Sequence, residues 1–84
     1  MDRSAVFEQV VAIVKPFVRN QVALANVGEG TLILRDLKVN SARLVDVVLR
    51  LQERFAIEVS DDDVDRVRTV GDTVSLVLRL RGEE

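Results

Sequence analysis

The first apolar residues of the chain recur with the spacing of a helix. One face of an amphipathic helix is marked by Val6, Val10, Ile13, Val14 and Phe17. Ser4 precedes them and is a suitable N-cap, whereas Pro16 lacks the backbone N–H that a helix interior requires. The pattern therefore predicts a first helix from about residue 5 to residues 15–19, ended or kinked near Lys15.

The next part of the chain has no decisive periodicity. Residues 26–30 include two glycines, which permit backbone angles that other residues resist, so we expect a loop there. Residues 31–39 are apolar at Leu32, Ile33, Leu34 and Leu37. That pattern is compatible with a strand or with an extended loop packed onto a core, and periodicity does not separate the two.

The clearest helical pattern runs from Ser41 to Phe55. Asn40 is a good N-cap, because its side-chain oxygen can accept a hydrogen bond from an N–H of the first turn. A stripe expected to face the core contains Leu44, Val47, Val48, Leu51 and Phe55.

The apolar arc of this helix is roughly 200° wide, whereas one core face usually needs about 100° or somewhat more. We therefore expect Val45 and Leu49 to be partly exposed, within about a quarter-turn of Ser41 and Gln52 on an ideal helix. The alternative is that both are ordinary core residues facing the first or the third helix.

Two further helix starts follow. Ser60 is followed by Asp61, Asp62 and Asp63, acids that stabilise a helix N-terminus, which predicts a short third helix. Thr69 and Asp72 resemble a capping box with Asp in place of Glu or Gln, which predicts a last helix through about Leu80. The residues of that last segment alternate between apolar and polar in a way that is by itself typical of a strand.

The core expected from these patterns is made almost entirely of aliphatic side chains. We expect it to include Val6, Val10, Val14, Leu34, Leu37, Leu44, Val48, Leu51, Phe55, Ile57, Val64, Val67, Val74 and Val77.

Composition limits the chemistry that is available. The 84 residues, net charge −2, contain neither Cys nor His, which excludes disulfides, thiolate metal sites and an imidazole base, although a site made of carboxylates alone remains possible. We expect a single domain over residues 1–84, cytoplasmic, with no membrane insertion and no enzymatic activity.

Two binding functions can be weighed on the charged residues. The ten Arg and two Lys are scattered along the chain, and there is no Trp or Tyr among them, so ordinary surface charge is favoured over nucleic-acid binding. Residues 58–65 contain five carboxylates, but an EF-hand counted from Asp61 would need Gly and Glu where Arg66 and Asp72 stand. Acids at a helix start explain this run better than a metal site.

Four segments between residues 31 and 77 resemble, in order and spacing, segments of acyl carrier proteins. They are residues 34–37, which precede a lone serine in Asn40-Ser41-Ala42, and residues 44–55, 57–63 and 69–72. The resemblance implies an all-α fold: a four-helix bundle with three longer helices, a short third helix and a long loop between the first two. It also decides the last segment in favour of a helix.

The resemblance implies that Ser41 carries a 4′-phosphopantetheine arm, added from coenzyme A by a phosphopantetheinyl transferase. The arm would hold acyl, or alternatively aminoacyl, groups as thioesters in a fatty-acid, lipid or secondary-metabolite pathway. A phosphodiester at Ser41 would lie at the first turn of a helix, where free N–H groups and the dipole stabilise an anion. The surface for partner docking would consist of Arg43, Val45, Asp46, Leu49 and Arg50.

The chain also departs from the family pattern. Carriers usually have Asp-Ser-Leu at the attachment serine, often with glycine where Lys38 stands, and their second helix is strongly acidic. Here the three arginines of that helix, Arg43, Arg50 and Arg54, outnumber its two acids, Asp46 and Glu53.

These departures lead to two interpretations. Because complementary charge sets partner choice, we expect a specialised carrier with dedicated acyl-transferring or acyl-modifying enzymes. The alternative is a carrier-like fold that is never modified and acts only as a protein-interaction module.

Overall fold

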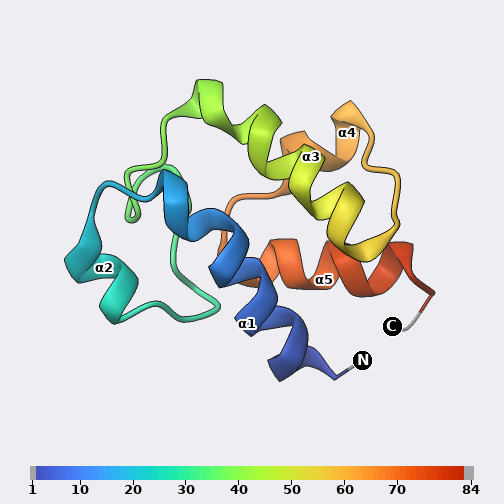
Figure 1. The fold of residues 1–84 in the computed structure, drawn as a ribbon, viewed down its shortest axis with the longest axis horizontal. Helices are drawn as coiled ribbons and strands as arrows, with labels where there is room; N and C mark the ends of the chain where they lie inside the picture. Colours follow the sequence, from blue (N-terminus) through green and yellow to red (C-terminus); the bar gives the residue numbers. More distant parts are fainter. Residues whose placement is uncertain (1, 83–84) are drawn as a thin grey trace.

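The computed structural model describes residues 2–82, which form helices joined by loops (Figure 1). The three longer helices are α1 (Arg3–Val14), α3 (Leu44–Phe55) and α5 (Val70–Leu80). The two short ones are α2 (Gln21–Ala25) and α4 (Asp61–Arg66), and single 3₁₀ turns form η1 (Lys15–Phe17) and η2 (Ser41–Arg43). The expected all-α bundle is confirmed, with α2 as an additional short helix inside the long loop.

The first helix begins earlier than predicted. Asp2, not Ser4, is the N-cap, and its Oδ1 accepts a hydrogen bond of 2.8 Å from the N–H of Ala5. The helix ends at Val14, and Pro16 lies in the 3₁₀ turn that follows. The prediction for the proline is confirmed, whereas the prediction for the cap is wrong by two residues.

The short helix α2 was not predicted. Its N-cap is Asn20, whose Oδ1 accepts a hydrogen bond from the N–H of Ala23 at 3.1 Å. The amide of Asn20 also donates to the backbone oxygen of Asp36 at 3.0 Å, so the same side chain holds α2 against the next loop. The cap residue was the sequence signal for this helix.

Residues 31–39 form a loop that packs onto the core and not a strand, and they contain a turn in which the N–H groups of Asp36 and Leu37 donate to the oxygen of Leu32. An isolated bridge joins Leu32 to Thr69. The N–H of Ile33 donates to the oxygen of Arg68, and the N–H of Val70 donates to the oxygen of Thr31, both at 3.0 Å. These bonds attach the loop to the start of α5.

The helices α4 and α5 both begin with a complete capping box. Ser60 and Asp63 exchange hydrogen bonds of 3.1 and 3.2 Å at α4, and Thr69 and Asp72 exchange bonds of 2.9 and 3.0 Å at α5. These N–H donors lower the pKa of both carboxyls, chiefly the backbone N–H of Ser60 for Asp63 and that of Thr69 for Asp72. Both predicted helix starts are confirmed.

The last segment is helical although its sequence alternates. α5 packs on α1 and lies below α3 in Figure 1, and it buries residues around much of its circumference, including Val70, Val74, Leu76, Val77 and Leu78. Among these residues Val70, Val74 and Val77 recur at helical spacing and are completely buried, which is the stripe of an amphipathic helix. The alternation in the same segment was therefore a poor guide to its secondary structure.

The core differs from the predicted one in the loop of residues 31–39 and around the cavity described below. Leu34 is 43% exposed and its neighbour Ile33 only 3% exposed, and the N–H of Ile33 is bonded to the oxygen of Arg68 at the start of α5. The expected core position of Leu34 is therefore wrong. Five other predicted core residues are only half-buried: Leu44, Val48, Ile57, Val64 and Val67.

Hydrogen bonds from Arg3 join α1 to the loop that contains Glu29 and to α5. Arg3 donates to both carboxylate oxygens of Glu29, with a shortest distance of 2.7 Å, and to the oxygens of Gly71 and Ser75 at 3.2 and 2.9 Å. The bonds from Arg3 to the carboxylate are the main reason why the pKa of Glu29 is lowered. No helix within residues 2–82 is long and apolar enough to cross a membrane.

Candidate functional site

Ser41 is exposed and is the first residue of the 3₁₀ turn η2, which leads into α3 at Leu44. The predicted cap is confirmed, because Asn40 Oδ1 accepts a hydrogen bond of 2.9 Å from the N–H of Ala42. The backbone oxygen of Asn40 accepts another hydrogen bond, of 2.8 Å, from the N–H of Arg43. Two N–H groups next to the serine are therefore already bonded, which weakens the argument that free N–H groups would hold an anion there.

The loop before Ser41 is firmly anchored. Leu37 is completely buried, and its backbone oxygen accepts hydrogen bonds of 3.1 Å from the N–H groups of both Arg19 and Asn20. Val39 is 4% exposed, and between these two buried residues Lys38 has a left-handed φ of 57°. The loop can thus present the serine hydroxyl to the outside from a base that packing holds in place.

The outer face of α3 carries two exposed apolar side chains. Val45 is 64% exposed and Leu49 is 52% exposed, so the alternative that both are core residues is wrong. Gln52 was expected on the same flank, but its Oε1 accepts a hydrogen bond of 2.9 Å from the N–H of Val59, which turns it toward the end of the helix.

The charged residues of this face have partners within the molecule. Arg43 and Asp46 form an exposed ion pair at 3.2 Å, which cancels one positive charge beside Ser41. The guanidinium of Arg50 lies over the ring of Phe17, with its Cζ 5.3 Å from the ring centroid, a cation–π contact that limits its movement.

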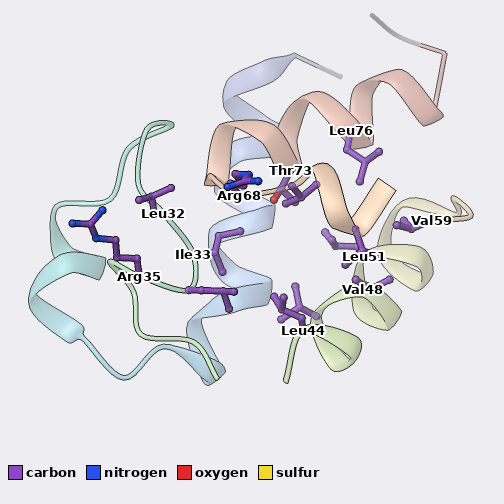
Figure 2. Close-up of a pocket in the computed structure, with 14 residues that line it drawn as sticks. Leu32, Ile33, Arg35, Leu44, Val48, Leu51, Val59, Arg68, Thr73 and Leu76 are labelled. Atoms are coloured by element: carbon purple, nitrogen blue, oxygen red, sulfur yellow. The ribbon is translucent and has the colours of Figure 1, made fainter. Parts of the chain in front are cut away.

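A cavity of about 350 Å³ lies between α3, α4, α5 and the loop of residues 31–39. Figure 2 shows Leu44, Val48 and Leu51 of α3 on one side of it, facing Thr73 and Leu76 of α5. Its wall is apolar apart from Arg35, Arg68 and Thr73, and is completed by Leu32, Ile33, Leu34, Val47, Val59, Val64 and Val67.

The sequence did not predict this cavity. The half-buried state of Val48, Val64 and Val67 is now explained, because these three side chains line a space rather than fill a core. Leu44, three residues after Ser41, belongs to the same wall. One residue of the cavity wall is therefore close to the serine in the sequence.

The acidic run at α4 is held by hydrogen bonds that have nothing to do with a metal. Asp63 caps the helix and also accepts a hydrogen bond of 3.0 Å from Arg79 on α5. Within residues 2–82, no group of three or more potential ligand side chains is arranged to hold a metal ion.

Comparison with known proteins decides the family. Residues 22–77 match the family model described as "Phosphopantetheine attachment site". An acyl carrier protein of Chlamydia felis is 32% identical over 62 residues, which cover 74% of this chain and 80% of that protein. The chain belongs to the acyl carrier protein family.

Two further relatives carry the same family name. An acyl carrier protein of Lactobacillus acidophilus is 35% identical over 57 residues, covering 68% of this chain and 71% of that one. The mitochondrial acyl carrier protein of Saccharomyces cerevisiae is 29% identical over 79 residues, covering 92% of this chain and 63% of that one.

Membership of this family defines what the carrier does at a general level. It is not an enzyme; it carries acyl groups on a covalently attached 4′-phosphopantetheine, whose thiol holds the acyl group as a thioester. Its partners accordingly include a phosphopantetheinyl transferase and enzymes that handle acyl groups. The chain fits this cofactor, because it presents an exposed serine on an anchored turn beside an apolar cavity.

Proposed function

We propose that Ser41 is the attachment point of the arm and that this carrier presents acyl, or alternatively aminoacyl, thioesters to dedicated enzymes. The observation that carries the proposal is an exposed serine on a capped turn, followed by the exposed apolar residues Val45 and Leu49. A transferase can reach that hydroxyl without unfolding any element.

The other serines support the assignment, because each is poorly suited to modification. Ser60 caps α4 through its side chain, and the Ser75 hydroxyl accepts a hydrogen bond of 2.9 Å from Arg3. Ser4 lies outside the region that matches the family model. Modification at Ser60 or Ser75 would disturb bonds that hold the fold, whereas Ser41 has a free surface.

The cavity supports an aliphatic cargo. Its volume of about 350 Å³ is at the small end of the range of ligand pockets, about 300–1,000 Å³. A chain tethered near Leu44 has a high local concentration there, and each buried methylene would contribute about 0.8 kcal/mol. A short or medium acyl chain can thus lie in the cavity between α3 and α5 while the thioester stays near the surface.

The charges of α3 support dedicated partners. Within this helix and the turn before it, three arginines stand against two acids. The pairing of Arg43 with Asp46 leaves two arginines against Glu53, so the remaining charge of the helix is positive. We infer that the partner surfaces are less basic than those of enzymes that serve acidic carriers, or are acidic, since like charges facing each other are costly. A specialised fatty-acid, lipid or secondary-metabolite pathway would supply such enzymes.

We also propose that residues 1–84 act as one domain, as a monomer and in the cytoplasm. Similarity to bacterial carriers over most of their length supports this. The mitochondrial relative makes an organelle the alternative compartment.

The proposal is tested by the intact mass of the purified protein before and after incubation with coenzyme A, Mg²⁺ and a broad-specificity phosphopantetheinyl transferase. We expect the mass to rise by one phosphopantetheine, no rise in Ser41→Ala, and a normal rise in the matched control Ser4→Ala. Circular dichroism checks that each variant is folded. No rise with several transferases on the folded protein would instead favour the unmodified interaction module.

A further inference from the structure

Three exposed cationic residues lie in the loop before Ser41 or are bonded to it through the backbone. Arg35 and Lys38 line the same open cleft beside α2, together with Asn20. The backbone N–H of Arg19 donates to Leu37 at 3.1 Å, which brings Arg19 to the same loop. We call Arg19, Arg35 and Lys38 the cationic patch.

The patch is only partly neutralised within the molecule, because one acid, Asp36, lines the same cleft as Arg35 and Lys38 and leaves two positive charges in excess. In the part of the chain from residue 2 to residue 82, none of its three side chains takes part in an ion pair or a side-chain hydrogen bond. The acid between them, Asp36, uses its Oδ2 to accept a bond of 2.9 Å from the N–H of Leu32. In Figure 2, Arg35 also extends away from the cavity, toward α2.

The patch adjoins the surface around Ser41. Lys38 precedes the serine by three residues, and Leu37 and Val39 on either side of it are buried, so packing fixes the loop that carries Lys38. On the other side, Arg50 lies over Phe17 in η1, two residues before Arg19. A protein that reaches the arm at Ser41 must therefore come close to this positive surface.

The densest group of acids in the chain lies elsewhere. Five carboxylates lie in residues 58–65, around α4, and α2 and α4 lie toward opposite ends of the long axis in Figure 1. Although the net charge is −2, the molecule thus has a positive surface at the cationic patch and a negative surface around α4.

We propose that the cationic patch is a second contact region for the enzymes that act at Ser41, and that it selects an acidic surface on them. This inference rests on the proposed attachment at Ser41. Complementary charge near the reacting group speeds the encounter and repels partners of the wrong sign. A membrane or a nucleic acid is a weaker candidate, because three cations are few for either and no aromatic side chain accompanies them in the patch.

The test compares two phosphopantetheinyl transferases, chosen so that one has an acidic and the other a basic carrier-docking surface. The patch variant is Arg35→Gln/Lys38→Gln, and the control is Arg66→Glu on α4, which lowers the net charge by the same two units. The kcat/KM for arm attachment is measured from 20 to 500 mM NaCl. Equal melting curves ensure that only folded proteins are compared.

With the acidic transferase, we expect the patch variant to lose about three- to tenfold in kcat/KM at low salt, and the loss to disappear at high salt. With the basic transferase, the same variant should gain. The control should stay within twofold of the unchanged protein with both enzymes.

Several results would overturn the inference. An equal loss with both transferases would mean a structural defect, and no loss with the acidic one would mean that the patch lies outside the contact. The patch would be assigned to a membrane or a nucleic acid if the unchanged protein bound phosphatidylglycerol vesicles or a DNA oligomer and the patch variant did not. It would be assigned to a second copy of this chain if the unchanged protein self-associated and the variant did not. If Ser41 gains no arm with any transferase, the mass spectrum reveals that the proposed function itself has failed, and the inference falls with it.

Discussion

Replacing Gly71 with alanine would force a methyl group against the loop that packs on the start of α5. Gly71 is buried, and its N–H donates to the oxygen of Glu29 at 2.8 Å. A Cβ at this position would stand 2.9 Å from that backbone oxygen and 3.0 Å from the Cβ of Glu29. Since the nearest atom belongs to the backbone, the loop has to move, and its bond to Gly71 and the pairing of Glu29 with Arg3 move with it.

The expected cost follows from three contributions. Overpacking of this kind costs typically about 1–3 kcal/mol, and a lost hydrogen bond adds about 0.5–1.5 kcal/mol. Alanine returns up to about 1 kcal/mol as a better helix former than glycine. The free energy of unfolding should therefore fall by about 2 kcal/mol, the middle of a range of about 0.5–3.5 kcal/mol, which for a domain of this size lowers the melting temperature by about 8–16 °C.

Thermal unfolding followed by circular dichroism measures this change. The controls are Gly28→Ala and Gly30→Ala, because a Cβ at either position meets nothing within 4 Å, and alanine there should leave stability unchanged or raise it slightly. A Gly71→Ala protein that melts at or above the temperature of the unchanged protein would refute the close packing of this loop. A similar decrease in the two controls would refute the explanation by a steric clash.

Three further results are expected. Ala56 ends α3 with a left-handed φ of 53°, so Ala56→Gly should raise the free energy of unfolding by about 0.5–1 kcal/mol in urea denaturation; a decrease would contradict this. The lowered pKa values of Asp63 and Asp72 mean that the folded state binds fewer protons than the unfolded one. The urea midpoint should therefore be constant near neutral pH and fall below about pH 4, less steeply in Asp72→Asn, and an equal slope in the variant would exclude Asp72 as a cause. Octanoyl loading should raise the melting temperature above that of the acetyl form, because more methylenes are buried; in Val48→Phe, whose ring would occupy the cavity, this difference should vanish, and its persistence would place the chain elsewhere.

Much of the fold follows from local signals, and those predictions were confirmed. The caps Asn40, Ser60 and Thr69 each satisfy backbone donors within three residues, so the chemistry that starts a helix is readable from the neighbouring sequence. The same holds for the exposure of Val45 and Leu49, which follows from an apolar arc too wide for one core face. The serine candidate came from the family resemblance of the flanking segments.

Contacts between distant segments were beyond the reach of such signals. Ile33 rather than Leu34 is buried because its N–H is bonded to the oxygen of Arg68, beside the bridge between Leu32 and Thr69. These contacts join residues far apart in the chain and leave no trace in the local sequence. In α5 the local signals disagreed: the segment alternates, but Val70, Val74 and Val77 also recur at helical spacing and are completely buried.

By itself, the sequence determined the caps that start η2, α4 and α5, the aliphatic composition of the core, the absence of thiol and imidazole chemistry and the position of the candidate serine. Only the tertiary structure decided that α3, α4, α5 and the loop of residues 31–39 line an open cavity and that Arg19 is bonded to the loop that carries Arg35 and Lys38. The physical reason is the range of the interactions. Capping and helical periodicity act within a few residues, whereas cavities and charged patches arise where packing brings together side chains that the sequence keeps apart.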